Sequence, residues 1–177
     1  MRKTKTSNFI SLSEDVVRQK VLNYAYLLLK IRPRSEKELV EKLSLYLHKH
    51  NMSEEKDSSL ISPIIEKLKR SGFVNDQAFV QYWIEKRFRG KPKGKYIIVP
   101  ELVKKGIDKE TIERELSKLQ SDYPEDTLIL SLVTKAESKY KELTGYKLKE
   151  KIIHYVVSRG FSYNQVRRVI DERTKKT

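Results

Sequence analysis

Apolar residues recur along almost the whole chain with the spacing of an α-helix. The first such stripe, at positions i, i+4, i+7 and i+11, is Val17, Val21, Tyr24 and Leu28. The same spacing returns at residues 129–140, and a helix places such positions on one face. The alternating pattern of a half-buried strand is almost missing. The sequence therefore predicts an all-α fold.

Helix breakers and capping residues divide this pattern into nine predicted helices. Pro33 ends the first, and Ser35 followed by Glu38 forms a capping box at the start of the second. Further along, glycines end helices, and Asn, Asp or Ser side chains begin them. These later boundaries are Gly72, Asn75, Gly90, Gly94, Gly106, Asp108, Pro124, Gly145, Gly160 and Ser162, with the eighth helix expected over Leu148–Arg159 and the ninth reaching about Arg173.

The pattern leaves two helix starts open. The third helix has rival starts at Asp57 and at Ser62–Pro63. In the fifth, we expect Pro100 only in the first turn, since proline lacks an N–H and clashes with a preceding turn. Residues 96–99 are rich in β-branched side chains, which favour strands. A lone strand would leave its backbone groups unpaired, so we predict helix there.

Superposing the helix stops reveals an internal repeat. Two of the stops, Gly106 and Gly160, lie 54 residues apart, and Asn51 takes the corresponding place in a first copy. In each copy, apolar residues stand eight and four positions before the stop, and an apolar residue and a cap residue follow it. The matching sets are Leu43, Leu47, Asn51, Met52 and Ser53; Ile98, Leu102, Gly106, Ile107 and Asp108; and Ile152, Val156, Gly160, Phe161 and Ser162.

The repeat predicts a tandem array of three three-helix units. We expect a flexible N-terminus over 1–14, followed by units at 15–72, 73–122 and 123–177. Hydrophobic residues make up only 38% of the chain and charged ones 35%, too little apolar material for one deep core. We therefore expect an elongated and curved molecule, and a monomer.

Charge points to the class of partner. The formal net charge is +14, which attracts polyanions such as nucleic acid at long range. The sequence has no cysteine and no apolar run long enough to span a membrane. We therefore expect a cytoplasmic protein with no membrane contact.

Catalytic motifs are missing from the sequence. The three histidines, His48, His50 and His154, form no metal-binding pair, because an i, i+2 spacing points side chains to different helix faces. No P-loop, dinucleotide fingerprint or converging set of acidic ligands is found. We expect no enzymatic activity, no metal and no cofactor.

Basic residues are concentrated in the middle of the chain, where no helix requires them. Arg87 is set apart, because its position four residues after Trp83 predicts stacking on the indole. The remaining cluster faces only one acidic residue, Glu101, and a second cluster lies in the ninth helix. We predict that both clusters bind the polyanionic partner, although a solvated helix face would look the same. The candidates are Lys86, Arg89, Lys91, Lys93, Lys95, Lys104, Lys105, Arg167 and Arg168.

Three segments resemble the signatures of the RecX family, in the same order and spacing. They are Arg32-Pro33-Arg34-Ser35 with Glu38, Leu39 and Leu43; Ser71-Gly72-Phe73-Val74-Asn75-Asp76 with Phe79, Trp83 and Arg87; and Gly94 with Glu101, Leu102 and Lys104-Lys105-Gly106-Ile107. Asn51 departs from the glycine usual in the family, and the third unit matches only as a repeat.

The resemblance implies a modulator of the RecA recombinase. Such a protein lodges in the groove of the RecA filament and blocks strand exchange, ATP hydrolysis and co-protease activity. Its partners would be the RecA filament and non-specific single- and double-stranded DNA, and the two basic clusters would contact RecA or DNA. The alternative is a helix-turn-helix-like protein that reads a DNA sequence directly, with the ninth helix as the reader. The acidic start of the sixth helix counts against this alternative.

Overall fold

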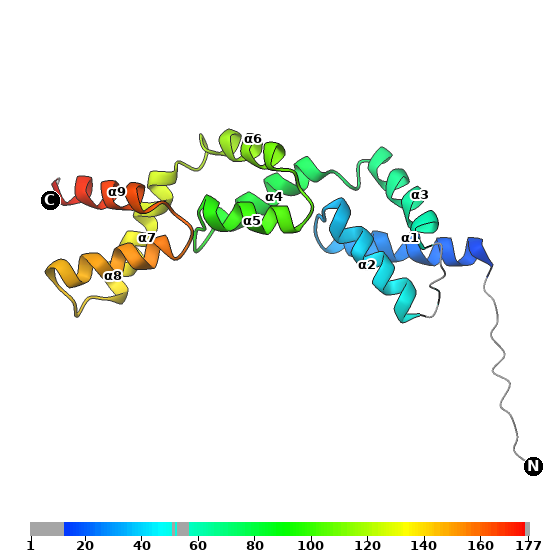
Figure 1. Cartoon of the computed structure of the whole chain (residues 1–177), viewed down its shortest axis with the longest axis horizontal. Helices are drawn as coiled ribbons and strands as arrows, with labels where there is room; N and C mark the ends of the chain where they lie inside the picture. The colour runs from blue at the N-terminus through cyan, green and yellow to red at the C-terminus, as the bar shows by residue number, and fades with distance from the viewer. Residues whose placement is uncertain (1–12, 51, 53–56, 176–177) are drawn as a thin grey trace, which may run out of the picture. The chain divides into compact units, whose positions relative to one another are not determined.

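The structure is a computed structural model that describes residues 13–50, 52 and 57–175. These residues form nine α-helices and no strand (Figure 1), which confirms the all-α repeat array. The segment 96–99 is helical, as predicted. The helices are α1 (Glu14–Ile31), α2 (Glu36–Lys49), α3 (Asp57–Arg70), α4 (Asp76–Phe88), α5 (Lys95–Lys104), α6 (Lys109–Leu119), α7 (Glu125–Lys139), α8 (Gly145–Val157) and α9 (Tyr163–Lys175).

The chain divides into two compact units, with the boundary after Val74. The first unit contains α1, α2 and α3, which enclose a core of their own. Residues 1–12, most of the segment predicted to be flexible, lie outside the described residues. The first core is built mainly from Val21, Ala25, Leu39, Leu43, Leu47, Ile61, Ile65 and Leu68.

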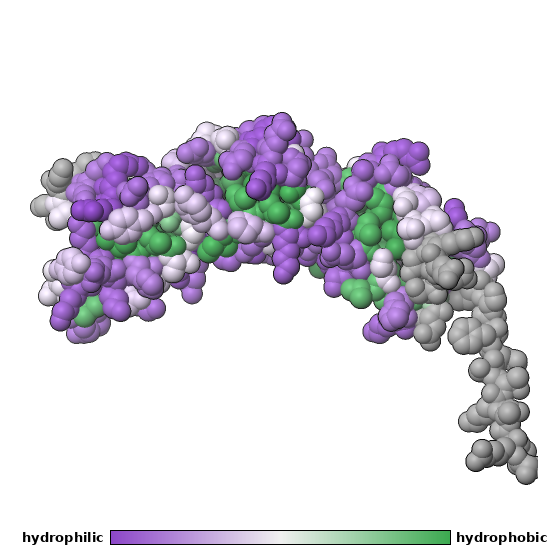
Figure 2. Space-filling model, viewed as in Figure 1, coloured by the Kyte–Doolittle hydropathy of each residue, from purple (hydrophilic) through white to green (hydrophobic). Residues whose placement is uncertain are grey.

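The second unit contains two three-helix repeats, each with a separate core. Helices α4–α6 enclose one core and α7–α9 enclose the other, and Phe88 packs against both. Apolar patches on the surface of this unit alternate with hydrophilic surface (Figure 2). The small share of apolar residues is therefore divided among small cores, as the composition predicted.

Three of the predicted helix caps are confirmed by side-chain hydrogen bonds. The Ser35 hydroxyl accepts a hydrogen bond from the Glu38 N–H at 3.2 Å. In the same way, Asn75 caps α4 and Asp108 caps α6, at 3.0 and 2.8 Å. Each cap satisfies an N–H group that the first helical turn leaves unpaired.

The segment before α2 is held by contacts within its own unit. Two parallel hydrogen bonds of 3.0 Å join the Arg32 guanidinium to the Glu38 carboxylate. The buried Arg34 side chain donates to the Leu28 carbonyl at 3.4 Å. This signature of the sequence therefore has a structural role, since it fixes the turn between α1 and α2.

The predicted helix stops of the second and third repeats have the required conformation. Gly106 and Gly160 have φ values of 86° and 85°, in the left-handed region that favours glycine. The following residues, Ile107 and Phe161, are buried. Asn51 and Ser53 lie outside the described residues. The apolar residues that precede each stop are all buried, and they are Leu43, Leu47, Ile98, Leu102, Ile152 and Val156.

Some boundaries differ from the sequence prediction. Helix α5 begins at Lys95, so Pro100 lies in its second turn and the first-turn expectation was wrong. Pro100 is exposed, where water can reach the backbone carbonyl that the missing N–H leaves unpaired. Helix α8 begins at Gly145, three residues before the predicted start. Its first turn holds the exposed Tyr146, so no buried stripe marks it.

A close backbone contact joins the second and third repeats. The Gly94 N–H donates to the Arg159 carbonyl at 2.8 Å, and the Tyr96 N–H donates to the Gly160 carbonyl at 3.1 Å. A Cβ on Gly94 would lie 2.1 Å from the Gly160 carbonyl oxygen. The turn between α8 and α9 can therefore approach the start of α5 only because Gly94 has no side chain.

Candidate functional site

The basic cluster of the second repeat is spread over α4, the loop 89–94 and α5. Lys95 and Lys104 stand at opposite ends of α5 and about half a turn out of phase, because each residue advances the helix by about 100°. A single face cannot hold both. The cluster that is continuous in sequence is therefore divided in space between the two ends of α5.

Glu101 on α5 is the hub of the polar contacts in this repeat. Its carboxylate accepts from Arg87 at 2.6 Å, from the Trp83 indole N–H at 2.9 Å and from Lys93 at 3.0 Å. Burial raises the pKa of Glu101, but the hydrogen bonds from Arg87, Lys93 and Trp83 together outweigh it and lower the pKa. Glu101 stays ionised at neutral pH, and Lys93 is a structural ion-pair partner.

Two cations lie over the indole ring of Trp83. The Arg87 guanidinium is 4.4 Å from the ring centroid, which confirms the predicted stacking. The Lys105 ammonium is 4.3 Å from the same ring. These contacts occupy the aromatic surface of Trp83. Lys105 therefore packs within the repeat, a role that the sequence did not indicate.

Four lysines of the cluster remain exposed and form no ion pair with a described carboxylate. They are Lys86, Lys91, Lys95 and Lys104. Arg89 is also exposed, at 72% of its side chain, and its contact with Glu85 at 3.2 Å is a weak surface pair. We call residues 89–95 the Gly90 loop. In it, Gly90 has a φ of 75° and Pro92 is buried, so the backbone is anchored while Arg89, Lys91 and Lys95 extend into solvent.

The basic residues of α9 have a different setting. Arg168 binds both carboxylate oxygens of Asp126, at 2.7 and 2.8 Å, and also pairs with Glu172 at 3.1 Å. Hydrogen bonding to Arg168 lowers the pKa of Asp126, and the same bond raises the pKa of Arg168. Arg168 thus joins α9 to α7. Arg167 is 60% exposed and lies 3.8 Å from Asp171, so it is the more accessible of the two.

In the alternative function, α9 would read the DNA sequence. Two of its polar side chains already form contacts within the repeat. The Gln165 amide donates to Asp126 at 3.2 Å, on the same carboxylate that binds Arg168. Both side chains therefore serve the packing of α9 on α7. The start of α6, the corresponding helix of the second repeat, carries an exposed Glu110.

The sequence also missed a buried carboxylate. Glu115 on α6 is fully buried and accepts hydrogen bonds from Gln77 at 3.0 Å, Gln81 at 2.6 Å and Lys118 at 2.8 Å. The hydrogen bond from Lys118 lowers its pKa, against the effect of burial. Glu115 joins α6 to α4 and needs no ligand. Only its place on the apolar stripe of α6 could have indicated it.

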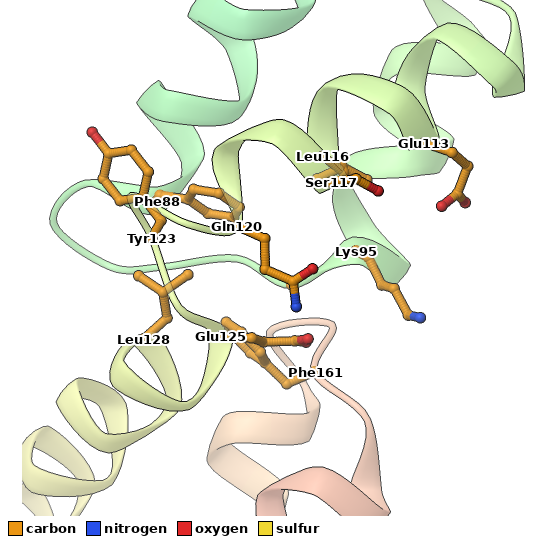
Figure 3. Close-up of a pocket in the computed structure, with 11 residues that line it drawn as sticks. Phe88, Lys95, Glu113, Leu116, Ser117, Gln120, Tyr123, Glu125, Leu128 and Phe161 are labelled. Atoms are coloured by element: carbon orange, nitrogen blue, oxygen red, sulfur yellow. The ribbon is translucent and has the colours of Figure 1, made fainter.

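A small cavity lies at the junction of the second and third repeats. Phe88, Leu116 and Phe161 form apolar walls, and the side chains of Lys95 and Gln120 also line it (Figure 3). Among the described residues, no cluster of three His, Asp or Glu side chains could hold a metal ion. Nor does any helix in the described ranges have the length and apolar character that crossing a membrane requires.

Comparison with protein families identifies the repeats. The second three-helix domain of RecX matches residues 75–116, and the third three-helix domain of RecX matches residues 124–170. The regulatory protein RecX of Streptococcus agalactiae serotype V is 32% identical over 140 residues, which are 78% of this chain and 50% of that protein. The RecX of Streptococcus pneumoniae strain Hungary19A-6 is 31% identical over 85% of this chain and 54% of its own length. The chain spans about half the length of these relatives.

Solved structures show the same architecture. The crystal structure of RecX from Lactobacillus salivarius has a TM-score of 0.72 and 25% identity, and the match covers 89% of this chain and 97% of that one. A second crystal structure, of a regulatory protein RecX, has a TM-score of 0.73 and 20% identity. The match covers 96% of this chain and 80% of that one, and at this identity it supports only a common fold. The family models, the relatives and the motifs agree, and the chain belongs to the RecX family.

Proposed function

We propose that this protein is a non-enzymatic regulator that binds RecA filaments on DNA and inhibits recombination, ATP hydrolysis and co-protease activity by RecA. The observation that carries the proposal is the match of two RecX domain models to consecutive repeats of the chain. In this role it acts in the cytoplasm, within DNA repair, recombination and the SOS response.

The Gly90 loop is the part of the second repeat best suited to the DNA of such a filament. Arg89, Lys91 and Lys95 are exposed, and only Arg89 has a carboxylate partner among the described residues. Gly90 is exposed and has no side chain, so the backbone of the loop can come close to a phosphate chain at that end. Lys93 and Lys105 support the repeat from within. We therefore place the phosphate contacts at the loop, with Lys86, Lys104 and Arg167 as secondary contacts.

The primary experiment is DNA-dependent ATP hydrolysis by RecA, with this protein added at substoichiometric amounts. Inhibition is expected if the protein stops filament growth or promotes loss of RecA. Strand exchange should fall in parallel. Unchanged hydrolysis and strand exchange at equimolar protein would overturn the proposed function while leaving the fold assignment intact.

A charge-reversal variant tests the loop. Changing Arg89, Lys91 and Lys95 to Glu should weaken binding to RecA–DNA filaments. If all three residues contact phosphates, the log–log salt slope should flatten by about 2, at about 0.7 per contact on single strands. The matched control reverses three exposed lysines of the first unit, Lys20, Lys37 and Lys42. Equal losses in both variants would mean that only net charge matters.

The alternative, direct reading of a DNA sequence, predicts a different result. It requires a footprint on one defined duplex sequence without RecA, with side chains of α9 on base edges. The contacts of Gln165 and Arg168 with Asp126 leave fewer polar groups at that helix for such readout. A defined footprint would favour the alternative, and RecA-dependent binding would favour the proposed function.

A further inference from the structure

An open groove lies between α8 and α9 of the third repeat. It shares no residue with the Gly90 loop. We call it the tyrosine groove. Tyr146 and Tyr163 line it together with Lys149 and Arg167, and Ile153 and Val157 supply apolar surface. Glu150 and His154 complete the lining. None of these residues has a role in the proposed function except Arg167, a secondary candidate. The groove therefore needs an explanation of its own.

The two tyrosines are the unusual feature of this groove. Tyr146 is 74% exposed and Tyr163 is 52% exposed, although large aromatic side chains normally serve packing. Each stands at the start of its helix, one on α8 and one on α9. The Tyr146 hydroxyl donates to the Glu150 carboxylate at 2.7 Å, which restricts the ring while leaving its face accessible. Two exposed aromatic rings therefore lie beside cations in this groove.

Basic groups accompany these rings. Lys149 binds Asp171 at 2.6 Å, and the same carboxylate lies 3.8 Å from Arg167. One carboxylate therefore holds two cations at the groove without neutralising both. Lys147 and Lys151 on α8 are exposed and form no ion pair with any residue in the described ranges. Lys147 and Lys151 lie beside the groove and not in its lining. Together with Lys149 and Arg167 they outnumber the carboxylates Glu150 and Asp171, so the surroundings are net basic, as a negatively charged ligand requires.

We propose that the tyrosine groove binds an unpaired stretch of nucleic acid, with bases stacked on Tyr146 and Tyr163 and phosphates near Lys149 and Arg167. Unpaired bases offer flat faces to aromatic side chains, whereas a duplex keeps its bases stacked on one another. An apolar peptide would not use the basic groups of the groove, and an acidic peptide would not use the two rings. A single strand satisfies both features.

The experiment is direct binding in the absence of RecA, measured by fluorescence anisotropy. Two probes are compared, a 20-nucleotide oligothymidine and an abasic strand of the same length, which has the same phosphates without bases. The wild-type protein should bind the oligothymidine more tightly. Replacing both tyrosines (Y146A with Y163A) should reduce this preference by about fivefold or more for each ring, the lower limit for base stacking on an aromatic side chain.

Matched variants keep this test sharp. The pair Y146F with Y163F retains both rings and removes the hydrogen bond to Glu150, so it should keep the preference for bases. Y96A removes an equally exposed tyrosine outside the groove, 62% exposed on α5, and should leave the preference unchanged. Circular dichroism checks that each variant stays folded.

Three outcomes would overturn the proposal. They are equal binding of both probes by the wild type, an equal loss of affinity for both probes in the alanine variant, and a loss of preference in Y96A as large as in the groove variant. Because RecA is absent, failure here leaves the proposed inhibition of RecA untouched. Conversely, a RecA assay without effect would leave the groove standing.

Discussion

The second and third repeats carry basic residues in similar numbers but use them differently. In the second, one carboxylate, Glu101, binds Arg87 and Lys93, while several lysines remain in solvent. In the third, carboxylates on α7 bind the arginines of α9, as Asp126 does for Arg168 and Glu137 does for Arg173. Basic side chains are thus largely left exposed in one repeat and used for helix packing in the other.

The difference comes from the position of the acidic residues, since both repeats contain them. In the third repeat, acidic side chains on α7 face the neighbouring helix, so ion pairs form between α7 and α9. In the second, the acidic side chains of α6 bind residues of α4 and α6 or face solvent. Glu85 and Glu101 pair with Arg89 and Lys93 of the Gly90 loop, so Lys91 and Lys95 keep their charge. Charge density along a sequence therefore does not predict which cations are available to a ligand.

The two repeats are joined by the close backbone contact at Gly94. A substitution there should have the largest effect of those considered. Changing Gly94 to Ala places a Cβ 2.1 Å from the Gly160 carbonyl oxygen. This oxygen cannot move unless the turn between α8 and α9 moves with it. We expect the free energy of unfolding to fall by about 3 kcal/mol or more, the range of severe core overpacking. Urea denaturation measures it.

Gly90 offers the control for that variant. Its φ is 75°, but a Cβ there would meet nothing within 4 Å. Changing Gly90 to Ala should cost only the left-handed conformation, about 1–2 kcal/mol. Equal losses at the two glycines would show that the close contact at Gly94 does not hold the repeats together.

A second substitution removes the Glu101 carboxylate, the hub of polar contacts in the second repeat. In the variant E101Q, the Arg87 and Lys93 side chains lose their counter-charge, and the weaker amide acceptor replaces a carboxylate. Because Glu101 is 25% exposed, we expect a loss of about 1–2 kcal/mol, near the lower end for hydrogen bonds to charged groups. Glu113 is an exposed acidic residue of the same unit, and E113Q should change stability by less than about 0.5 kcal/mol.

The same residue gives a pH dependence with a defined sign. The folded-state pKa of Glu101 is lowered from 4.5, so the folded protein holds this proton less tightly than the unfolded chain. Its contribution is fully present above about pH 4.5 and is lost as the pH falls through the lowered pKa. The wild-type protein should therefore lose its advantage in free energy of unfolding over E101Q as the pH falls. An advantage that does not shrink as the pH falls below 4.5 would contradict this assignment.

The smallest expected effect concerns Arg168 and Asp126. Both side chains are almost half exposed, so a double-mutant cycle with R168A and D126N should give a coupling energy of about 0.2–1 kcal/mol. Binding of R168A to RecA–DNA filaments should keep the salt slope of the wild type. A slope as flat as that of the Gly90 loop variant would make Arg168 a phosphate contact and remove the contrast between the repeats.

Much of the fold could be predicted from local sequence signals. Ser35, Asn75 and Asp108 cap helices, and Gly106 and Gly160 end them, because both effects depend on one side chain and its own backbone. Pro100 was misplaced because the cost of proline depends on whether water reaches the neighbouring carbonyl. Exposure of that kind is a tertiary property.

The candidate site could be predicted only as a list of cations. The stacking of Arg87 on Trp83 was predictable, because four residues along a helix bring two side chains together. The pairing of Lys93 with Glu101 and of Arg168 with Asp126 was not, because partners on different helices are chosen by packing. The tyrosine groove was missed for the same reason, since its two rings come from separate helices.

The junction of Gly94 with the turn at Gly160 has a consequence for how such chains diverge. Both hydrogen bonds there use main-chain atoms only, so no particular side chain encodes the joint. Selection need only forbid a Cβ at a few points, while the surrounding helices can exchange almost every residue. The mutual orientation of the two repeats can therefore be inherited through long divergence with little sequence record beyond the two glycines, and a designer could transplant it by copying backbone geometry and those glycines.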